Sequence, residues 1–182
     1  VASDVEWPVL VMDIGGGSTE LVLGRPDADG ALTIVAGRSL DVGSVRLRER
    51  FLHSDPPTPA EVAEAASYVD ALIDASGVPV EQARAWIGVG GTATALSAIN
   101  LGLASYDRAR VQGSTMTREQ VQAMAPRLLG MPVADVLLIP TMQPGRADVI
   151  CGGALIAARV GERCPVDLRV SEADILDGVV MA

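Results

Sequence analysis

The sequence predicts an α/β domain with a mixed sheet of about five strands and helices on both of its faces. Of the 182 residues, 49% are hydrophobic but only 3% are aromatic, which suits a core filled by aliphatic side chains. The first forty residues alternate apolar runs with turn residues, as the strands of an antiparallel meander do. Further along, strand, helix and strand follow one another, so part of the sheet should be parallel. Because no repeat or linker interrupts the chain, we expect one domain over residues 1–182.

A glycine-rich hairpin near the start of the chain carries the strongest chemical signal. The apolar run 9–12 leads into Asp13, and Glu20 precedes a second apolar run at 21–23. Three consecutive glycines, at 15–17, stand between the two carboxylates. Both runs read as strands, and glycine allows a sharp turn with positive φ between them. Bare glycine backbone also lets N–H groups approach an anion closely.

The two carboxylates indicate a phosphate site that uses a cation. Neither carboxylate can bind phosphate itself, but each can hold a hard cation or orient a water molecule. A P-loop is excluded because no lysine follows the glycines, and a dinucleotide fingerprint is excluded because a strand rather than a helix follows them. The alternative is a purely structural glycine turn.

The remaining chain alternates predicted helices with short strands. Capping boxes at Thr58 and Thr117 begin two helices, and Gly77 and Gly130 end them. In order, the expected elements are a strand at 31–39, helices at 41–52 and 58–77, a strand at 85–89, a helix capped by Thr92 or Thr94, an edge strand or loop at 111–116, helices at 117–130 and within 132–140, a long helix at 143–159, a strand at 166–170 and a closing helix at 171–181.

A second glycine turn, at 90–92, offers another place for an anion. It joins a buried strand to a helix N-terminus, where backbone N–H groups point outward, although tight strand-to-helix packing also needs glycine. Arg46 either faces an anion or is a solvated helix charge, and both interpretations stay open. The glycine pair at 152–153 indicates a close approach inside a helix, with packing as the first interpretation. Arg146 and Asp148 are expected to pair with each other.

Charge and composition limit the possible function classes. A formal net charge of −9 argues against broad nucleic-acid binding, which needs a basic stripe, so a phosphate site must be local. Cys151 and Cys164 are too few for a disulfide framework and are expected to be reduced thiols of a cytoplasmic protein. No apolar run approaches about 18 residues, so we expect no membrane span. No signal peptide opens the chain, which starts at Val1 as an excised domain does.

The hairpin resembles one family in particular. Asp-Ile-Gly-Gly-Gly-Ser-Thr-Glu, from Asp13 to Glu20, is similar to the second phosphate loop of the exopolyphosphatase / guanosine pentaphosphate phosphatase (Ppx/GppA) family. That family belongs to the actin, sugar-kinase and heat-shock-chaperone ATPase superfamily. Three further stretches resemble family segments in the same order, namely 43–51, 88–96 and 146–150.

The resemblance implies a ribonuclease H-like (actin-like ATPase) lobe. It would be the second, C-terminal lobe of a two-lobe phosphatase whose first lobe is absent from this chain. The parent reaction would be hydrolysis of a terminal phosphoanhydride, in inorganic polyphosphate or guanosine pentaphosphate, at a cleft between lobes that uses Mg²⁺ or Mn²⁺. The catalytic base would belong to the missing lobe, so the fragment alone should be inactive. Expected partners are the substrate, the missing lobe and a second copy in a homodimer, with no nucleic acid and no membrane.

The same resemblance assigns roles to individual residues. Asp13 and Glu20 would hold the metal, and Glu20 would also help position the nucleophile as the catalytic residue. The family's last segment normally reads Ser-x-x-x-Leu-Arg-Glu-Gly, whereas residues 171–178 contain Asp177 and no arginine, so the charge of that arginine is not supplied. Phosphate would be bound by Gly15, Gly16, Gly17, Ser18, Thr19, Arg46, Gly90, Gly91 and Thr92.

Two other functions stay open. A lobe of an ATP-dependent sugar or acetate kinase would carry an adenosine pocket and transfer phosphate to an acceptor. A non-catalytic lobe would use the hairpin to sense a nucleotide, and its function would survive the loss of Asp13 and Glu20.

Overall fold

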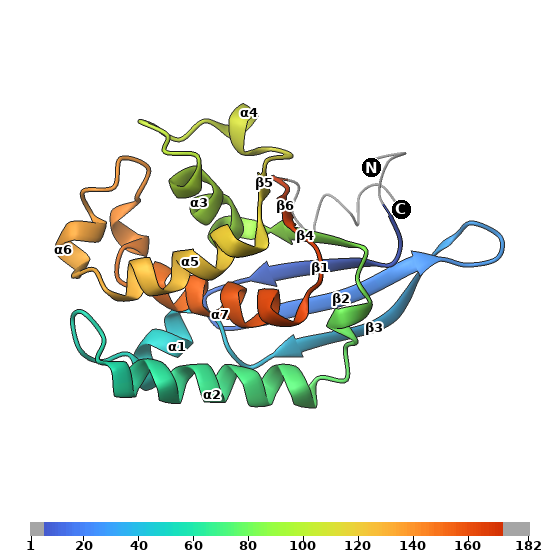
Figure 1. Ribbon diagram of the computed structural model, residues 1–182, viewed down its shortest axis with the longest axis horizontal. Coiled ribbons are helices and arrows are strands. Elements are labelled where there is room, and N and C mark those ends of the chain that lie inside the picture. The colour runs from blue at the N-terminus through green and yellow to red at the C-terminus, as the bar shows by residue number, and fades with distance from the viewer. Residues whose placement is uncertain (1–5, 173–182) are drawn as a thin grey trace.

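The computed structural model describes residues 6–172 and contains one six-stranded mixed sheet (Figure 1). The strand order across the sheet is β3-β2-β1-β4-β6-β5. The first three strands form the predicted antiparallel meander, and β4 and β6 continue parallel to β1. The short strand β5 forms the edge of the sheet and pairs antiparallel with β6. The strands are β1 (Val9–Ile14), β2 (Thr19–Pro26), β3 (Leu32–Leu40), β4 (Ala85–Val89), β5 (Thr115–Met116) and β6 (Leu168–Val170).

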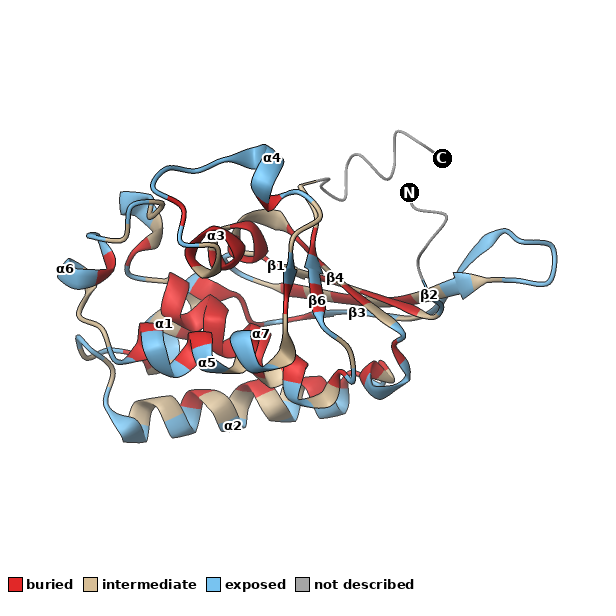
Figure 2. Ribbon diagram, turned by 45° about the horizontal axis from the view of Figure 1, so that its top comes forward, coloured by how far each residue is buried: buried red, intermediate tan, exposed pale blue. Residues whose placement is uncertain are grey.

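One face of the sheet is buried by helices (Figure 2). Leu10, Met12 and Ile14 are buried in β1, and the residues between them are only half-buried. This period of two places the buried side chains on one face of the sheet. Trp86 of β4 continues the same apolar surface and contacts Gly161 in the helix above it.

The helices form a layer on that buried face. Helices α3 and α7 lie on the sheet, and α1, α2 and α5 pack around α7 (Figure 1). The predicted closing helix at 171–181 lies outside the described residues from position 173 onward. The helices are α1 (Ser44–Phe51), α2 (Pro59–Ala75), α3 (Gly90–Asn100), α4 (Arg108–Val111), α5 (Arg118–Leu129), α6 (Val133–Val136) and α7 (Ile150–Arg163), with 3₁₀ turns η1 (Val80–Gln82) and η2 (Pro144–Arg146).

Both predicted capping boxes are confirmed, but two other helix starts differ from the prediction. Helix α3 begins directly after β4 with Val89 at its N-cap, so neither Thr92 nor Thr94 caps it. The hydroxyl of Thr92 instead donates a hydrogen bond to the carbonyl oxygen of Ile14 in β1. Helix α7 begins at Ile150 rather than 143, because the chain first makes the separate 3₁₀ turn η2.

The glycine pair in α7 allows the helix to approach the segments around the candidate site. A Cβ on Gly152 would lie 2.9 Å from the carbonyl oxygen of Ser44, at the start of α1. A Cβ on Gly153 would lie 2.5 Å from Cγ2 of Thr92, in the first turn of α3. Such distances leave no room for a side chain, so the packing interpretation of this pair is confirmed.

Ion pairs attach α2 to α7 on the outer side of the helical layer. The guanidinium of Arg159 donates to both carboxylate oxygens of Asp70, at 2.8 and 2.6 Å, and Arg163 adds a third contact at 3.0 Å. Partial burial acts to raise the pKa of Asp70, but the two arginines outweigh it and hold that pKa below its ordinary value.

The two cysteines are free and buried, as expected of reduced thiols. Burial raises the pKa of Cys164 to about 11 and also raises that of Cys151. None of the helices between residues 6 and 172 has the length and apolar character that crossing a bilayer requires.

Candidate phosphate-binding site

The loop that joins β1 to β2 is held from behind by the N-terminus of α1. The N–H of Ser44 donates to the carbonyl oxygen of Gly15 at 2.9 Å. The N–H groups of Val45 and Arg46 both donate to the carbonyl oxygen of Gly16, each at 3.0 Å. First-turn N–H groups of a helix need acceptors outside the helix. Here the carbonyl groups of the hairpin loop are those acceptors.

The same contacts turn the N–H groups of the loop outward. In a trans peptide, C=O and N–H point in opposite directions, so the N–H groups of Gly16 and Gly17 point away from α1. Together with the N–H of Ser18 they have no acceptor among residues 6–172, whereas Gly15 donates to the Ser18 carbonyl at 2.9 Å. Three adjacent unpaired donors form the kind of anion-binding concavity that the sequence predicts.

The hairpin requires glycine for close approach rather than for a left-handed backbone. None of the three loop glycines has a positive φ, so that expectation is wrong. A Cβ on Gly16 would lie 3.2 Å from Cγ2 of Val45. A Cβ on Gly43, the N-cap of α1, would lie 2.5 Å from both the carbonyl carbon and oxygen of Gly16. Loop and helix therefore touch backbone to backbone.

Asp13 and Glu20 flank the loop as a directly opposed pair on β1 and β2. Opposed residues of neighbouring strands carry their side chains on the same face, within reach of one shared ion. The Asp13 carboxylate packs against Gly90, and Glu20 accepts a hydrogen bond from the Ser39 hydroxyl at 2.7 Å. Two carboxylates suit a Mg²⁺ ion that keeps several waters and takes further oxygens from phosphate. No complete cage of three acidic, histidine or cysteine side chains occurs in the described part of the chain.

The second glycine turn faces the hairpin. Gly90 has a φ of +76°, and the Asp13 carboxylate occupies the place that a Cβ there would need. The N–H groups of Gly91 and Thr92, at the start of α3, have no acceptor within residues 6–172. The Thr92 hydroxyl donates to the carbonyl of Ile14 at 2.8 Å, so this side chain fixes α3 to β1. Phosphate binding by Thr92 stays a prediction, and its backbone N–H is the donor that faces it without a partner.

Two other predicted phosphate ligands already have partners in the fold. Thr19 is fully buried and its hydroxyl donates to the carbonyl oxygen of Val42 at 2.6 Å, so this side chain is engaged inside the fold. Arg46 is paired with Asp41, yet its Nη2 lies only 3.6 Å from the place of a Cβ on Gly17. The guanidinium of Arg46 therefore lies beside the loop.

Arg146 is the site residue that sequence reasoning missed. Its guanidinium lies directly against the backbone of Gly91. Within residues 6–172 it makes no hydrogen bond or ion pair, so the predicted pair with Asp148 is wrong. The one signal in the sequence was its place at the start of the stretch 146–150.

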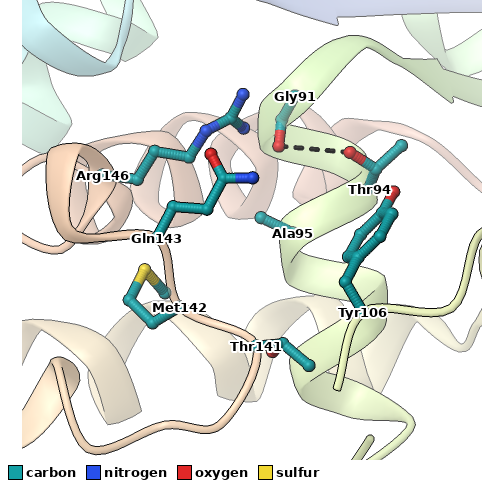
Figure 3. Close-up of a pocket in the computed structure, with 8 residues that line it drawn as sticks. All are labelled: Gly91, Thr94, Ala95, Tyr106, Thr141, Met142, Gln143 and Arg146. Carbon is teal, nitrogen blue, oxygen red and sulfur yellow. Dashed lines mark hydrogen bonds between the residues drawn. The ribbon is translucent and has the colours of Figure 1, made fainter.

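Two adjoining pockets lie beside the hairpin loop and the second glycine turn, and neither lining includes Asp13, Gly17, Ser18 or Glu20. The phosphate pocket, of about 230 Å³, is bounded by the hairpin loop and by the starts of α1, α3 and α7. The side pocket, of about 160 Å³, shares Gly91 and Arg146 with it (Figure 3). The side pocket is lined by Gly91, Thr94, Ala95, Tyr106, Thr141, Met142, Gln143 and Arg146.

Comparison with known proteins identifies relatives over the whole chain. The model of the Ppx/GppA phosphatase family matches residues 1–180. Exopolyphosphatase 2 of Mycobacterium tuberculosis is 43% identical over 182 residues, which cover 96% of this chain and 55% of the relative. Among solved structures, an exopolyphosphatase-like protein superposes with a TM-score of 0.91 at 36% identity, covering 98% of this chain and 60% of that one. A Ppx/GppA phosphatase of Aquifex aeolicus gives a TM-score of 0.86 at 29% identity, covering 98% and 57%.

The chain therefore spans a little over half the length of these relatives. Its mixed sheet and helical layer agree with the lobe expected of an actin-like ATPase fold. Family match, sequence identity and structural superposition all lead to the same conclusion: the chain belongs to the Ppx/GppA phosphatase family.

Proposed function

We propose that this chain is the phosphate- and metal-binding lobe of a phosphohydrolase that removes the terminal phosphate of inorganic polyphosphate or guanosine pentaphosphate. The observation that carries the proposal is the hairpin loop, whose carbonyl groups are taken by α1 while the N–H groups of Gly16, Gly17 and Ser18 are unpaired. The phosphatase and exopolyphosphatase names of the relatives support the same reaction class.

The residues of this lobe would bind and orient the terminal phosphoryl group. The unpaired hairpin N–H groups would approach it from one side, and those of Gly91 and Thr92 from the other. Arg146 lies between these segments and would bring a positive charge to the phosphate. In phosphoryl transfer, catalysis is mostly such positioning and charge stabilisation of the transferring group.

Asp13 and Glu20 would hold Mg²⁺ or Mn²⁺, directly or through water. The bound ion would neutralise charge on the phosphoryl oxygens and help to orient the attacking water. The position of Glu20 beside the loop suits a role in orienting the attacking water. The base that accepts the proton of that water would come from the other lobe. Within residues 6–172 the lining of the phosphate pocket contains no acidic side chain, and Asp13 and Glu20 lie on the strands that flank the loop.

The proposal also concerns the whole protein. Since the relatives are nearly twice as long, the isolated 182-residue chain should bind phosphate weakly and show negligible hydrolysis. Two free, buried thiols fit a reducing compartment, which supports a cytoplasmic protein. A homodimer stays a prediction.

The test is phosphate release by the product of the complete reading frame. Glu20→Ala should reduce turnover of polyphosphate and guanosine pentaphosphate about a hundredfold or more, with an unchanged melting temperature. Glu64→Ala, at an exposed helix position, is the matched control. Near-normal activity of Glu20→Ala would remove this residue from the mechanism. Phosphate transfer from ATP to an acceptor would support the kinase alternative instead, and full function without Asp13 and Glu20 would support a sensing lobe.

A further inference from the structure

The β3 edge, residues 31–37, is an exposed apolar border of the sheet. No strand within residues 6–172 pairs with it, because β3 is the terminal strand of the sheet order. Leu32 and Ile34 are 73% and 72% exposed, and Val35 is 44% exposed. The free N–H and C=O groups of such an edge can pair with another strand and promote aggregation. The β3 edge is therefore expected to be covered in the functional protein.

The β3 edge lacks most of the features that prevent strands from pairing. Natural proteins block open edges with charged side chains, proline, bulges or very short strands. Of these features β3 has a bulge, where its register against β2 shifts beside Leu23 and Gly24. The strand is nine residues long, and residues 31–37 include neither a charged residue nor a proline. The β3 edge thus remains open to a partner strand.

The β3 edge begins at the end of the hairpin that is remote from the phosphate site. Thr19 of β2 follows the phosphate-binding loop, whereas Pro26 ends β2 and lies opposite Leu32. The eight residues of β2 separate these two ends by roughly 25 Å. The remote end projects beyond the helical layer, with its residues exposed (Figures 1 and 2). A second lobe that closes the phosphate cleft would face the site end, a step that rests on the proposed function, and would leave the β3 edge uncovered.

A second copy of the same chain fits the β3 edge. Two identical strands can pair antiparallel about a two-fold axis, so that each satisfies the donors and acceptors of the other. With the axis at Ile34, the two Ile34 side chains oppose each other, and Leu32 opposes Ala36 of the second copy. Arg38, the next charged residue along β3, then opposes Gly30, so no like charges meet. Because the chain carries a net charge of −9, two copies approach with least repulsion at an uncharged surface.

We propose that the β3 edge is a dimerisation surface, at which two copies of the protein join their sheets into one continuous sheet. Strand pairing along residues 31–37 supplies the hydrogen bonds, and Leu32, Ile34 and Val35 supply the apolar contacts. Since the two strands run in opposite directions, the two phosphate sites lie at opposite ends and stay open to their own second lobes. Such an interface buries less than the roughly 800 Å² per partner of a standard one, so we expect a Kd on the order of 10 µM.

The experiment measures the molar mass of the complete protein by light scattering during gel filtration. Across concentrations from about tenfold below to tenfold above the expected Kd, the wild-type mass should rise from one copy to two. Ile34→Glu sets two carboxylates against each other and should weaken association about a hundredfold or more. Leu138→Glu is the matched control, because this leucine is 78% exposed but lies beyond α6, away from the sheet edge. It should dimerise like wild type.

Ile34→Cys tests the position of the axis directly. Side chains opposed across an antiparallel pair have Cβ atoms about 5 Å apart, so a short reagent that links two thiols should join two copies. Both natural cysteines are buried, and wild type should therefore not be linked. The linked fraction should fall when Ile34→Cys is diluted below the Kd.

Several results would overturn the inference. They are a monomeric wild type over the whole concentration range, a dimer that survives Ile34→Glu, or a dimer that Leu138→Glu disrupts instead. If the second lobe covers the β3 edge, wild type stays monomeric and Ile34→Glu lowers the melting temperature, which also overturns it. Molar mass does not depend on turnover, so a failure of the proposed function, seen as absent phosphate release, is distinguished from a failure of this one.

Discussion

Gly43→Ala should disturb the candidate site although Gly43 itself contributes no phosphate-binding group. The new Cβ would lie 2.5 Å from the carbonyl carbon and oxygen of Gly16 and 2.6 Å from the carbonyl oxygen of Gly15. Ordinary van der Waals contacts begin about 1 Å further away. All three atoms belong to the backbone, so no side-chain rotation can relieve the contact, and either α1 or the hairpin loop must move.

The magnitude follows from the bonds that such a movement breaks. Overpacking of this kind costs about 1–3 kcal/mol. The bonds from Ser44 and Val45 to the loop carbonyls, at 2.9 and 3.0 Å, are lost or stretched, at about 1 kcal/mol each. We therefore expect a loss of roughly 3 kcal/mol, or a melting temperature lower by roughly 6–12 °C for a chain of this size. Phosphate binding should weaken as well, because the loop N–H groups lose their orientation.

Gly37→Ala is the matched control. A Cβ on Gly37 would meet its nearest neighbours at 3.7 Å, which is ordinary contact, and the residue lies in β3 without a positive φ. Its stability should stay within about 0.5 kcal/mol of wild type. Thermal unfolding and phosphate calorimetry on both variants decide the matter. A Gly43→Ala protein as stable as the control would refute the backbone contact between α1 and the hairpin.

Three further predictions address the helix layer, the cap of α2 and the carboxylates. Gly153→Ala should destabilise the protein although alanine favours a helix by about 1 kcal/mol, because its Cβ meets Cγ2 of Thr92 at 2.5 Å; adding Thr92→Ser, which removes that methyl group, should restore part of the melting temperature. Hydrogen bonds to Glu61, chiefly from the Thr58 backbone, lower its pKa from 4.5 to about 2, so its stabilisation is complete above pH 4.5 and is lost as the pH falls toward 2. Glu61→Gln should therefore melt lower at pH 7 and approach wild type as the pH falls from 4.5 to about 2, and a difference independent of pH would contradict this origin. Finally, Asp13→Asn with Glu20→Gln should bind inorganic phosphate more tightly than wild type without metal and lose any gain from Mg²⁺, as measured by calorimetry; an unchanged response to Mg²⁺ would exclude both carboxylates from the metal site.

The order of elements could be predicted from local patterns, whereas the site depends on contacts that local patterns do not contain. The hairpin could be recognised in the sequence because two apolar runs, two carboxylates and three glycines stand within fifteen residues. The capping boxes of α2 and α5 are equally local and were confirmed. That α1 would donate its first-turn N–H groups to the hairpin could not be predicted, since nothing in residues 43–46 specifies the carbonyl groups of a loop almost thirty residues earlier.

Two threonines and one arginine of the site show the same limit. Thr19 and Thr92 belong to motifs that suggest donors to phosphate, yet both hydroxyls donate hydrogen bonds to backbone carbonyls inside the fold. A threonine has one hydroxyl proton, and whether a ligand or a carbonyl receives it depends on which segment packs opposite. Arg146 is the reverse case, because a charge assigned to a local partner is unpaired and points to the pocket only once η2 brings it against α3.

These contacts explain how a loop of three glycines can present a fixed set of donors. Glycine-rich backbone is mobile by itself, so free loop N–H groups would have to be ordered when phosphate binds, at a cost to affinity. Here α1 fixes the loop through its carbonyls, Thr92 fixes the end of β1 to α3, and Gly153 seats α7 against that same threonine. The two sets of N–H groups are thus set by buried packing before any ligand arrives. Donors that need no reorganisation are what the stabilisation of a developing charge requires, and they explain why a strongly acidic chain can offer a phosphate site made largely of backbone.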